Sequence, residues 1–173
     1  MVRTNLTAIG GVVEVESTPG SGTAISMTLP ITLAIVQSLI VCVAGQRFAI
    51  PLAAVQETLL VDPGAIQRSR DRELLGLRGD ALLLRRLSDE FGLEAASPGA
   101  KLFVVVVGLG ETRIGLLVDQ FEGQQDTVLK PIQGPFRAMR GIVGATEIGD
   151  REPVLVLDVA SLIEDSARRR EAA

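Results

Sequence analysis

The stretch LFVVVVGLGETRIGLLVDQFE, residues 102–122, decides the fold of this chain. It opens with the apolar run Leu102 to Val107, turns at a glycine, and returns as a second apolar strand from Ile114 to Val118. Such runs predict strands with at least one buried face. An acidic and amide patch, Asp119 to Glu122, follows, and the 173 residues contain no histidine and no cysteine pair. A scaffold without reactive groups suggests a protein that binds and transmits.

An earlier stretch, LIVCVAGQRFAIPLAAVQE at residues 39–57, repeats this order of parts. Each copy has an apolar strand, a glycine turn, a second strand and then an acidic and amide patch. The repeat predicts two similar small β-barrels, one from about 31–93 and the other from about 101–158. Chance similarity between apolar strands is the alternative interpretation.

Strand and turn signals continue along the chain. The pattern predicts a polar loop at 62–72, a hairpin at 74–84 around Gly79-Asp80, a short helix at 85–93 and a linker at 94–100. A last hairpin is expected at 141–157. Asp158 is placed to cap a C-terminal helix over residues 158–170.

The first thirty residues differ from the rest. Val2, Leu6 and Ile9 lie on one face of a predicted helix, which Gly10-Gly11 ends. Two alternating strands follow, at 13–16 and 25–29, joined by a strong turn signal. A helix and one hairpin cannot bury enough surface to stand alone. We therefore expect residues 1–30 to be the tail of another domain, or to pack on the remainder.

Composition excludes several functional classes. The net charge is −4 and aromatic residues make up 3% of the chain, which disfavours nucleic acid as a partner. The single cysteine, Cys42, fits a reducing compartment and lies in an apolar run, as buried filler does. No apolar stretch reaches the length of a membrane helix or a signal peptide. We expect a soluble, cytoplasmic protein without membrane insertion, metal or cofactor.

Several motifs carry a resemblance to a known family. They are Phe48 to Glu57, Leu77-Arg78-Gly79 followed by Leu82 and Leu84, Gly141 to Thr146, and Leu157 to Val159. Together they resemble the CheW-like regulatory domain at the C-terminal end of CheA, the histidine kinase of bacterial chemotaxis. The likeness covers about residues 31–165. One departure is Leu83, where the family often has proline.

The N-terminal piece carries a second resemblance. Ser17 to Thr23, running into a strand that ends at Leu29-Pro30, is similar to the end of a GHKL-type kinase ATPase domain. The remaining nucleotide-binding boxes of that family and the phosphoacceptor histidine do not occur in this sequence. We therefore expect residues 1–30 to be an ATPase remnant without catalytic activity, followed by a CheW-like domain at 31–173.

The resemblance implies a mainly β fold of two intertwined five-stranded SH3-like barrels. It also implies a non-catalytic scaffold that binds a CheW-type adaptor and chemoreceptor tips, at receptor arrays, and couples receptor state to upstream kinase domains in cis. The junction Pro30-Ile31-Thr32-Leu33 would transmit motion to those domains.

Seven residues are candidates for partner binding. Val55 and Glu57 belong to a segment that faces partners in CheW-like proteins. Arg78, beside the Gly79 turn, could pair with a partner carboxylate or satisfy an internal carbonyl. The others lie in the acidic patch: Asp119, Phe121 and Glu122. A solvated strand end is the alternative for Val55 and Glu57, and core packing is the alternative for Phe121.

Three other functions remain open. The chain could be a free-standing CheW-type adaptor whose start resembles a kinase end. It could be a nucleotide-binding GHKL fragment, with the turn Gly20-Ser21-Gly22-Thr23 cradling phosphate. It could also be a β-barrel protein that acts only through self-association.

Overall fold

The structure is a computed structural model that describes residues 12–18, 20, 22–28, 35–69, 72–94, 102–130, 132, 139–149 and 152–171. The chain divides into two compact units, Met1–Ile35 and Val36–Ala173. Three predicted features lie outside the described residues: the N-terminal helix, residues 95–100 of the linker at 94–100, and the junction Pro30 to Leu33.

The first unit contains a β-hairpin. Strand β1, Val12–Thr18, pairs antiparallel with β2, Gly22–Thr28, and Val15 stands opposite Ile25. Both of these side chains are 61% exposed. The two strands expected from alternating apolar residues are thus confirmed.

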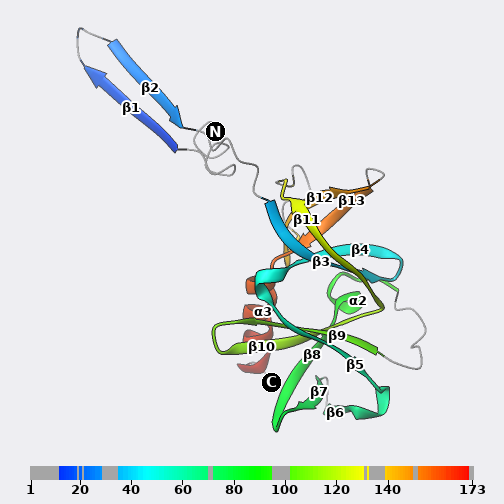
Figure 1. Cartoon of the computed structure of the whole chain (residues 1–173). Helices are drawn as coiled ribbons and strands as arrows, with labels where there is room; N and C mark the ends of the chain where they lie inside the picture. The colour runs from blue at the N-terminus through cyan, green and yellow to red at the C-terminus, as the bar shows by residue number, and fades with distance from the viewer. Residues whose placement is uncertain are drawn as a thin grey trace. The chain divides into compact units, whose positions relative to one another are not determined.

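The second unit contains two sheets, and Figure 1 shows the five-stranded one above the six-stranded one. The strands of the five-stranded sheet, in the order β11-β3-β4-β13-β12, are Gln120–Val128, Ile35–Val43, Gln46–Pro51, Glu152–Leu157 and Ile142–Ile148. Two hydrogen bonds of 2.8 and 2.9 Å between Lys130 and Ala145 join its outer strands. This contact closes the sheet into a barrel, which we call barrel 1.

The six-stranded sheet, barrel 2, follows the order β5-β9-β10-β8-β7-β6. Its strands are Val55–Val61, Leu102–Leu109, Thr112–Val118, Asp80–Arg86, Arg72–Leu77 and Ile66–Ser69. Each sheet therefore takes strands from both sequence repeats, joined through the parallel pairs β4–β13 and β8–β10. This exchange confirms the mainly β, intertwined fold. One correction concerns the strand number, since the second sheet has six strands where five were expected, because residues 66–69 add strand β6.

Short helices complete the second unit. Two 3₁₀ turns, η1 at Leu52–Ala54 and η2 at Pro63–Ala65, flank β5, and helix α2 spans Leu87–Glu90. Helix α3, Val159–Glu171, packs against β9 and β10. The Asp158 carboxylate accepts a 3.1 Å hydrogen bond from the Ser161 backbone N–H, so the predicted N-cap is confirmed.

The apolar run of β9 is buried on both faces. Val104 and Val106 point into barrel 2, whereas Val105 and Val107 point the other way, into a core shared with barrel 1 and α3. Side chains alternate along a strand, so a continuous apolar run needs cover on both sides. The shared core comprises Leu39, Val41, Val43, Phe48, Ile50, Leu87, Val105, Val107, Ile114, Leu116, Val118, Leu157, Val159, Leu162 and Ile163.

Two local predictions were wrong. Residues 66–69 form strand β6 where a polar loop was expected, because Ile66 packs against the barrel 2 core and Arg68 pairs with Glu73 across β6 and β7. The helix expected over 85–93 is only the four residues of α2. Arg85 and Arg86 instead continue β8, paired with Leu116 and Leu117 of β10.

We expect Gly144→Ala to destabilise the protein by about 1–3 kcal/mol, because overpacking forces the closure of barrel 1 to shift. An added Cβ would lie 2.5 Å from Leu129 Cδ1 and 2.8 Å from the Lys130 carbonyl oxygen. Gly76→Ala, whose Cβ meets nothing within 4 Å, is the matched control. Denaturant unfolding measures both, and equal midpoints would contradict the prediction.

We expect Thr146→Val to stabilise the protein by about 1 kcal/mol. The Thr146 hydroxyl is buried and has no hydrogen-bond partner among the described residues. Thr127→Val is the contrasting variant, since the Thr127 hydroxyl donates to the Val36 carbonyl at 2.7 Å and contacts Ser38 Oγ at 2.9 Å. Unfolding free energies should move in opposite directions, and a loss of stability in both variants would count against this account.

Candidate functional site

The turn between β7 and β8 has a strained, non-glycine residue at its first position. Arg78 has φ 52° and Gly79 has φ 92°, the positive values that a two-residue type I′ hairpin turn requires. A left-handed backbone costs an L-residue roughly 1–2 kcal/mol relative to the ordinary regions. Asparagine or glycine would meet this geometry more cheaply. Ala44, in the β3–β4 turn, has the same left-handed backbone, so the strain alone assigns no role to the Arg78 side chain.

Arg78 forms an ion pair across the mouth of barrel 2. Its Nη2 donates to Glu57 Oε2 at 2.8 Å. Glu57 shares the inward face of β5 with Leu59 and Val61, which belong to the barrel 2 core, and its side chain is largely covered. The Arg78 side chain remains 73% exposed. The structure therefore brings two predicted residues together and holds the guanidinium at the surface.

A second ion pair lies beside the first. Arg113 Nη2, on β10, donates to Asp80 Oδ2, at the start of β8, at 2.6 Å. This contact places the β9–β10 turn, with the exposed side chains of Leu109 and Glu111, next to the β7–β8 turn. We call this end of barrel 2 the rim; its residues are Glu57, Arg78, Gly79, Asp80, Leu109, Glu111 and Arg113.

The Val55 side chain does not belong to the rim. It begins β5, pairs with Val107, and its side chain packs against the shared core. A β-bulge at Gln56 separates Val55 from Glu57 in the pairing with β9. The bulge lets the chain leave the shared core at Val55 and still place Glu57 on the inward face.

Asp119 is engaged in a structural contact with the β3–β4 turn. Its Oδ2 accepts a 2.6 Å hydrogen bond from the Ala44 backbone N–H, and its own N–H donates to the Cys42 carbonyl at 3.0 Å. Ala44 has φ 51°, the same left-handed geometry as Arg78. The Asp119 carboxylate thus ties the strained β3–β4 turn of barrel 1 to the connection between β10 and β11.

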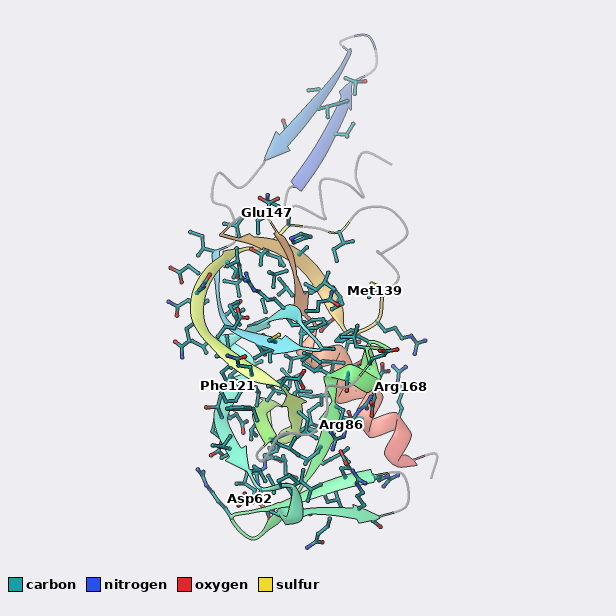
Figure 2. All side chains as sticks on the ribbon, turned by 90° about the vertical axis from the view of Figure 1, so that its right-hand side faces the viewer. Asp62, Arg86, Phe121, Met139, Glu147 and Arg168 are labelled. Atoms are coloured by element: carbon teal, nitrogen blue, oxygen red, sulfur yellow. The ribbon has the colours of Figure 1, made fainter. Side chains whose placement is uncertain are left out.

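Phe121 and Glu122 also make contacts within the chain. The Phe121 ring meets Phe103 edge-on, with centroids 4.9 Å apart, and is partly buried against the shared core. Figure 2 shows it at the level between the strands of the two sheets. Glu122 pairs with Arg47 of β4 at 3.2 Å. The packing of Phe121 agrees with its interpretation as a core residue.

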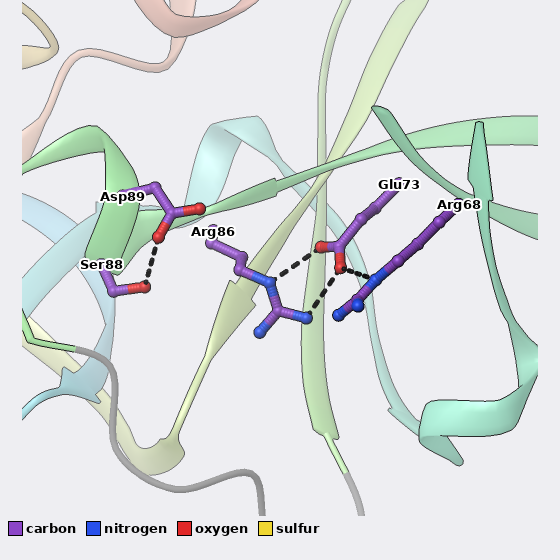
Figure 3. Close-up of polar contacts among 5 residues, drawn as sticks. All are labelled: Arg68, Glu73, Arg86, Ser88 and Asp89. Carbon is purple, nitrogen blue, oxygen red and sulfur yellow. Dashed lines mark hydrogen bonds and ion pairs between the residues drawn. The ribbon is translucent and has the colours of Figure 1, made fainter. Parts of the chain in front are cut away.

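A separate charged cluster lies on the β6–β8 side of barrel 2 (Figure 3). Arg86 binds the Glu73 carboxylate with two hydrogen bonds of 2.8 and 2.9 Å, and Arg68 adds one of 3.1 Å. Burial by itself raises the pKa of Glu73, but the hydrogen bonds and charges of Arg86 and Arg68 outweigh it and hold that pKa below its ordinary value. Glu73 is therefore ionised and fixed, and it anchors the short edge strand β6.

Arg85 connects three elements in a largely buried position. From β8 it donates to Glu90 of α2 and to Ser166 Oγ of α3, the latter at 3.0 Å. Ser166 Oγ in turn donates to the Leu162 carbonyl at 2.7 Å. These bonds hold α3 in place over the shared core.

The described residues offer little for chemistry. In that part of the chain no group of three His, Cys, Asp or Glu side chains is arranged to hold a metal ion. None of the helices described is long and apolar enough to cross a membrane. What the rim presents is a fixed arrangement of charges with an exposed Leu109, which suits contact with another macromolecule.

Comparison with protein families agrees with this description. The model of the CheW-like domain matches residues 37–167, which cover both barrels and most of α3. The chain belongs to the CheW-like domain family. Within it, the chain is 36% identical to the sensor histidine kinase CheAY of Helicobacter pylori, over 95% of the chain. It is 35% identical to the chemotaxis protein CheA of Bacillus subtilis, over 94%.

The match to these CheA proteins lies in their C-terminal region. This CheW-like chain spans only about a fifth to a quarter of their length, 20% of the Helicobacter protein and 24% of the Bacillus protein. Among solved structures, the scaffolding protein TtCheW of Thermoanaerobacter tengcongensis has a similar fold, with a TM-score of 0.61. That similarity covers 72% of this chain and 89% of TtCheW, at 15% identity.

Several rim residues carry no functional signal in the sequence. The pattern predicts Asp80 only as a turn residue, and Leu109 and Arg113 only as parts of a hairpin. One signal was available for Leu109, a lone apolar residue between Gly108 and Gly110, where burial is hard to achieve. The pairing of Asp80 with Arg113 had no local signal, because the two residues lie on strands far apart in sequence.

We expect the stability of the protein to fall on acidification partly through Glu73. Its pKa is lowered in the folded state, so its contribution is complete above the ordinary carboxylate pKa and is lost as pH falls through the lowered value. Glu73→Gln should lower stability at neutral pH and flatten the acid limb of an unfolding-against-pH curve. The control is Glu147→Gln, which breaks the exposed pair with Lys130 and should change stability at neutral pH by less than about 1 kcal/mol. Parallel acid limbs for wild type and Glu73→Gln would contradict the assignment.

Proposed function

We propose that this chain is the regulatory and scaffolding module of a chemotaxis histidine kinase. In this role it binds a CheW-type adaptor and the cytoplasmic tips of chemoreceptors, at receptor arrays in the cytoplasm. Its N-terminal residues 1–30 are the end of an ATPase domain, and residues 31–173 are the regulatory domain. The junction Pro30 to Leu33 transmits receptor state to kinase domains in cis. The module itself catalyses no reaction and needs no cofactor.

One observation carries this proposal: Arg78 is held at the surface by Glu57 on a strained turn of a CheW-like domain. A guanidinium fixed in this way can bind a partner carboxylate at small cost in side-chain entropy. Family membership adds support, since matched CheA proteins carry this region as part of a histidine kinase. Val55, Glu57 and Gly79 then position the contact rather than make it.

Two roles for the other candidates follow from their contacts. Asp119 and Glu122 hold the bend between β10 and β11 through Ala44 and Arg47, and Phe121 packs beside Phe103. We assign them to shaping the partner surface from within. Removing their side chains would displace the backbone and so weaken the binding of an adaptor nearby.

We expect Arg78→Asn to weaken binding of the CheW-type adaptor of the same organism by roughly tenfold or more, as loss of an interface arginine often does. Asparagine tolerates the left-handed backbone, so the melting temperature should stay near that of wild type. Calorimetric titration of the chain with purified adaptor measures the affinity.

Arg68→Asn is the matched control for this experiment. Arg68 is also an exposed arginine paired with a glutamate, 76% exposed against 73% for Arg78, but it lies on the edge strand β6. Equal losses in the two variants would reject a specific role for Arg78. Absence of adaptor binding by the wild-type chain would reject the proposed function, and saturable binding of an ATP analogue would favour the nucleotide-binding alternative.

A further inference from the structure

The two ion pairs of the rim have opposite polarity. In the first pair the cation, Arg78, is 73% exposed and its anion, Glu57, is largely covered. In the second pair the anion, Asp80, is 74% exposed and its cation, Arg113, is more covered. Each covered member holds an exposed charge in place, and the two exposed charges are separated only by Gly79.

The two turns of the rim carry further groups beside these charges. Glu111, exposed on the β9–β10 turn, adds a second exposed negative charge to the rim. Leu109, the last residue of β9 before that turn, is 57% exposed, one of few large apolar side chains so open in the described residues. The rim therefore combines one exposed positive group, two exposed negative groups and an exposed apolar one.

We propose that Asp80, Glu111 and Leu109 select the partner that docks on the rim. This proposal rests on the proposed function and deepens it by stating the chemistry of the adaptor surface. That surface carries an acidic side chain opposite Arg78, a basic side chain opposite Asp80 and Glu111, and an apolar recess for Leu109. A partner with the reversed order of charges meets like charge at both positions, which costs affinity and excludes it.

Fixed charges make this selection effective. Arg78 and Asp80 are each restrained by a partner from the same chain, at 2.8 and 2.6 Å, so less side-chain entropy is lost when a second protein binds. A rim charge acts mainly on the rate of association and on its salt dependence. The exposed leucine contributes buried apolar area at the contact.

A charge swap within the second pair separates recognition from folding. Asp80→Arg combined with Arg113→Glu keeps an ion pair between β8 and β10 but reverses the charge shown to the partner. The experiment compares wild type, this double variant, Asp80→Asn and Leu109→Ser for binding to the CheW-type adaptor, at low and high ionic strength. Melting temperature and sedimentation velocity of each variant report on fold and self-association.

We expect the double variant to melt with wild type and to bind the adaptor at least tenfold more weakly. Asp80→Asn should lose part of the affinity and part of its salt dependence, and Leu109→Ser should lose affinity at every salt concentration. Recovery of wild-type affinity in the double variant would show that the pair serves only the fold and would overturn the inference.

Two other outcomes also decide the matter. If the variants change self-association of the chain and leave adaptor binding intact, the rim is an interface between copies and the inference is wrong. If the wild-type chain does not bind the adaptor, the proposed function is wrong, and this inference, which rests on it, is wrong as well. If the wild type binds the adaptor and every variant binds it equally well, the inference that the rim selects the partner is wrong, while the proposed function stands.

Discussion

The structure depends on the burial of β9 and β10 on both faces. Their alternating residues feed two cores, one inside barrel 2 and one shared with barrel 1 and α3. A single small barrel covers only its own interior, so the outer face of these strands needs a second sheet. Barrel 1 supplies it through β3 and β4, and α3 covers the remainder. Because each sheet contains strands from both repeats, the two repeats cannot separate without breaking strand pairs.

Polar groups then occupy the places where this packing ends. Asp119 lies between β10 and β11, where the chain passes from barrel 2 to barrel 1. Its carboxylate binds the strained turn at Ala44, between β3 and β4. Arg85 secures α3 to the shared core, and the Arg68, Arg86 and Glu73 cluster secures the edge strand β6. These contacts are satisfied within the chain. The rim carries two ion pairs beside each other, and the largely exposed charge is positive in one pair and negative in the other.

The proposed contact rests on the rim. In this domain of the CheW-like family, the rim is the end of barrel 2 where restrained charges and an exposed leucine lie together. Residues chosen from the acidic patch after β10 shape the fold, whereas Arg78 keeps both an internal anchor and an open face. The left-handed turns at Ala44 and Arg78 each meet a carboxylate, through the backbone N–H of Ala44 and through the side chain of Arg78.

Local periodicity and turn chemistry predict most strands, the glycine turns and the cap at Asp158, and the sequence motifs carry the resemblance to the family. Arg78 and Glu57 were each predicted as candidates, but separately. Their pairing, the contact of Asp80 with Arg113 and the contact of Asp119 with a turn of the other barrel depend on the folded arrangement of the strands. The sequence of an apolar strand that is buried on both faces does not show which sheet or helix packs against each face. Strand exchange and every contact that depends on it are therefore set by long-range packing.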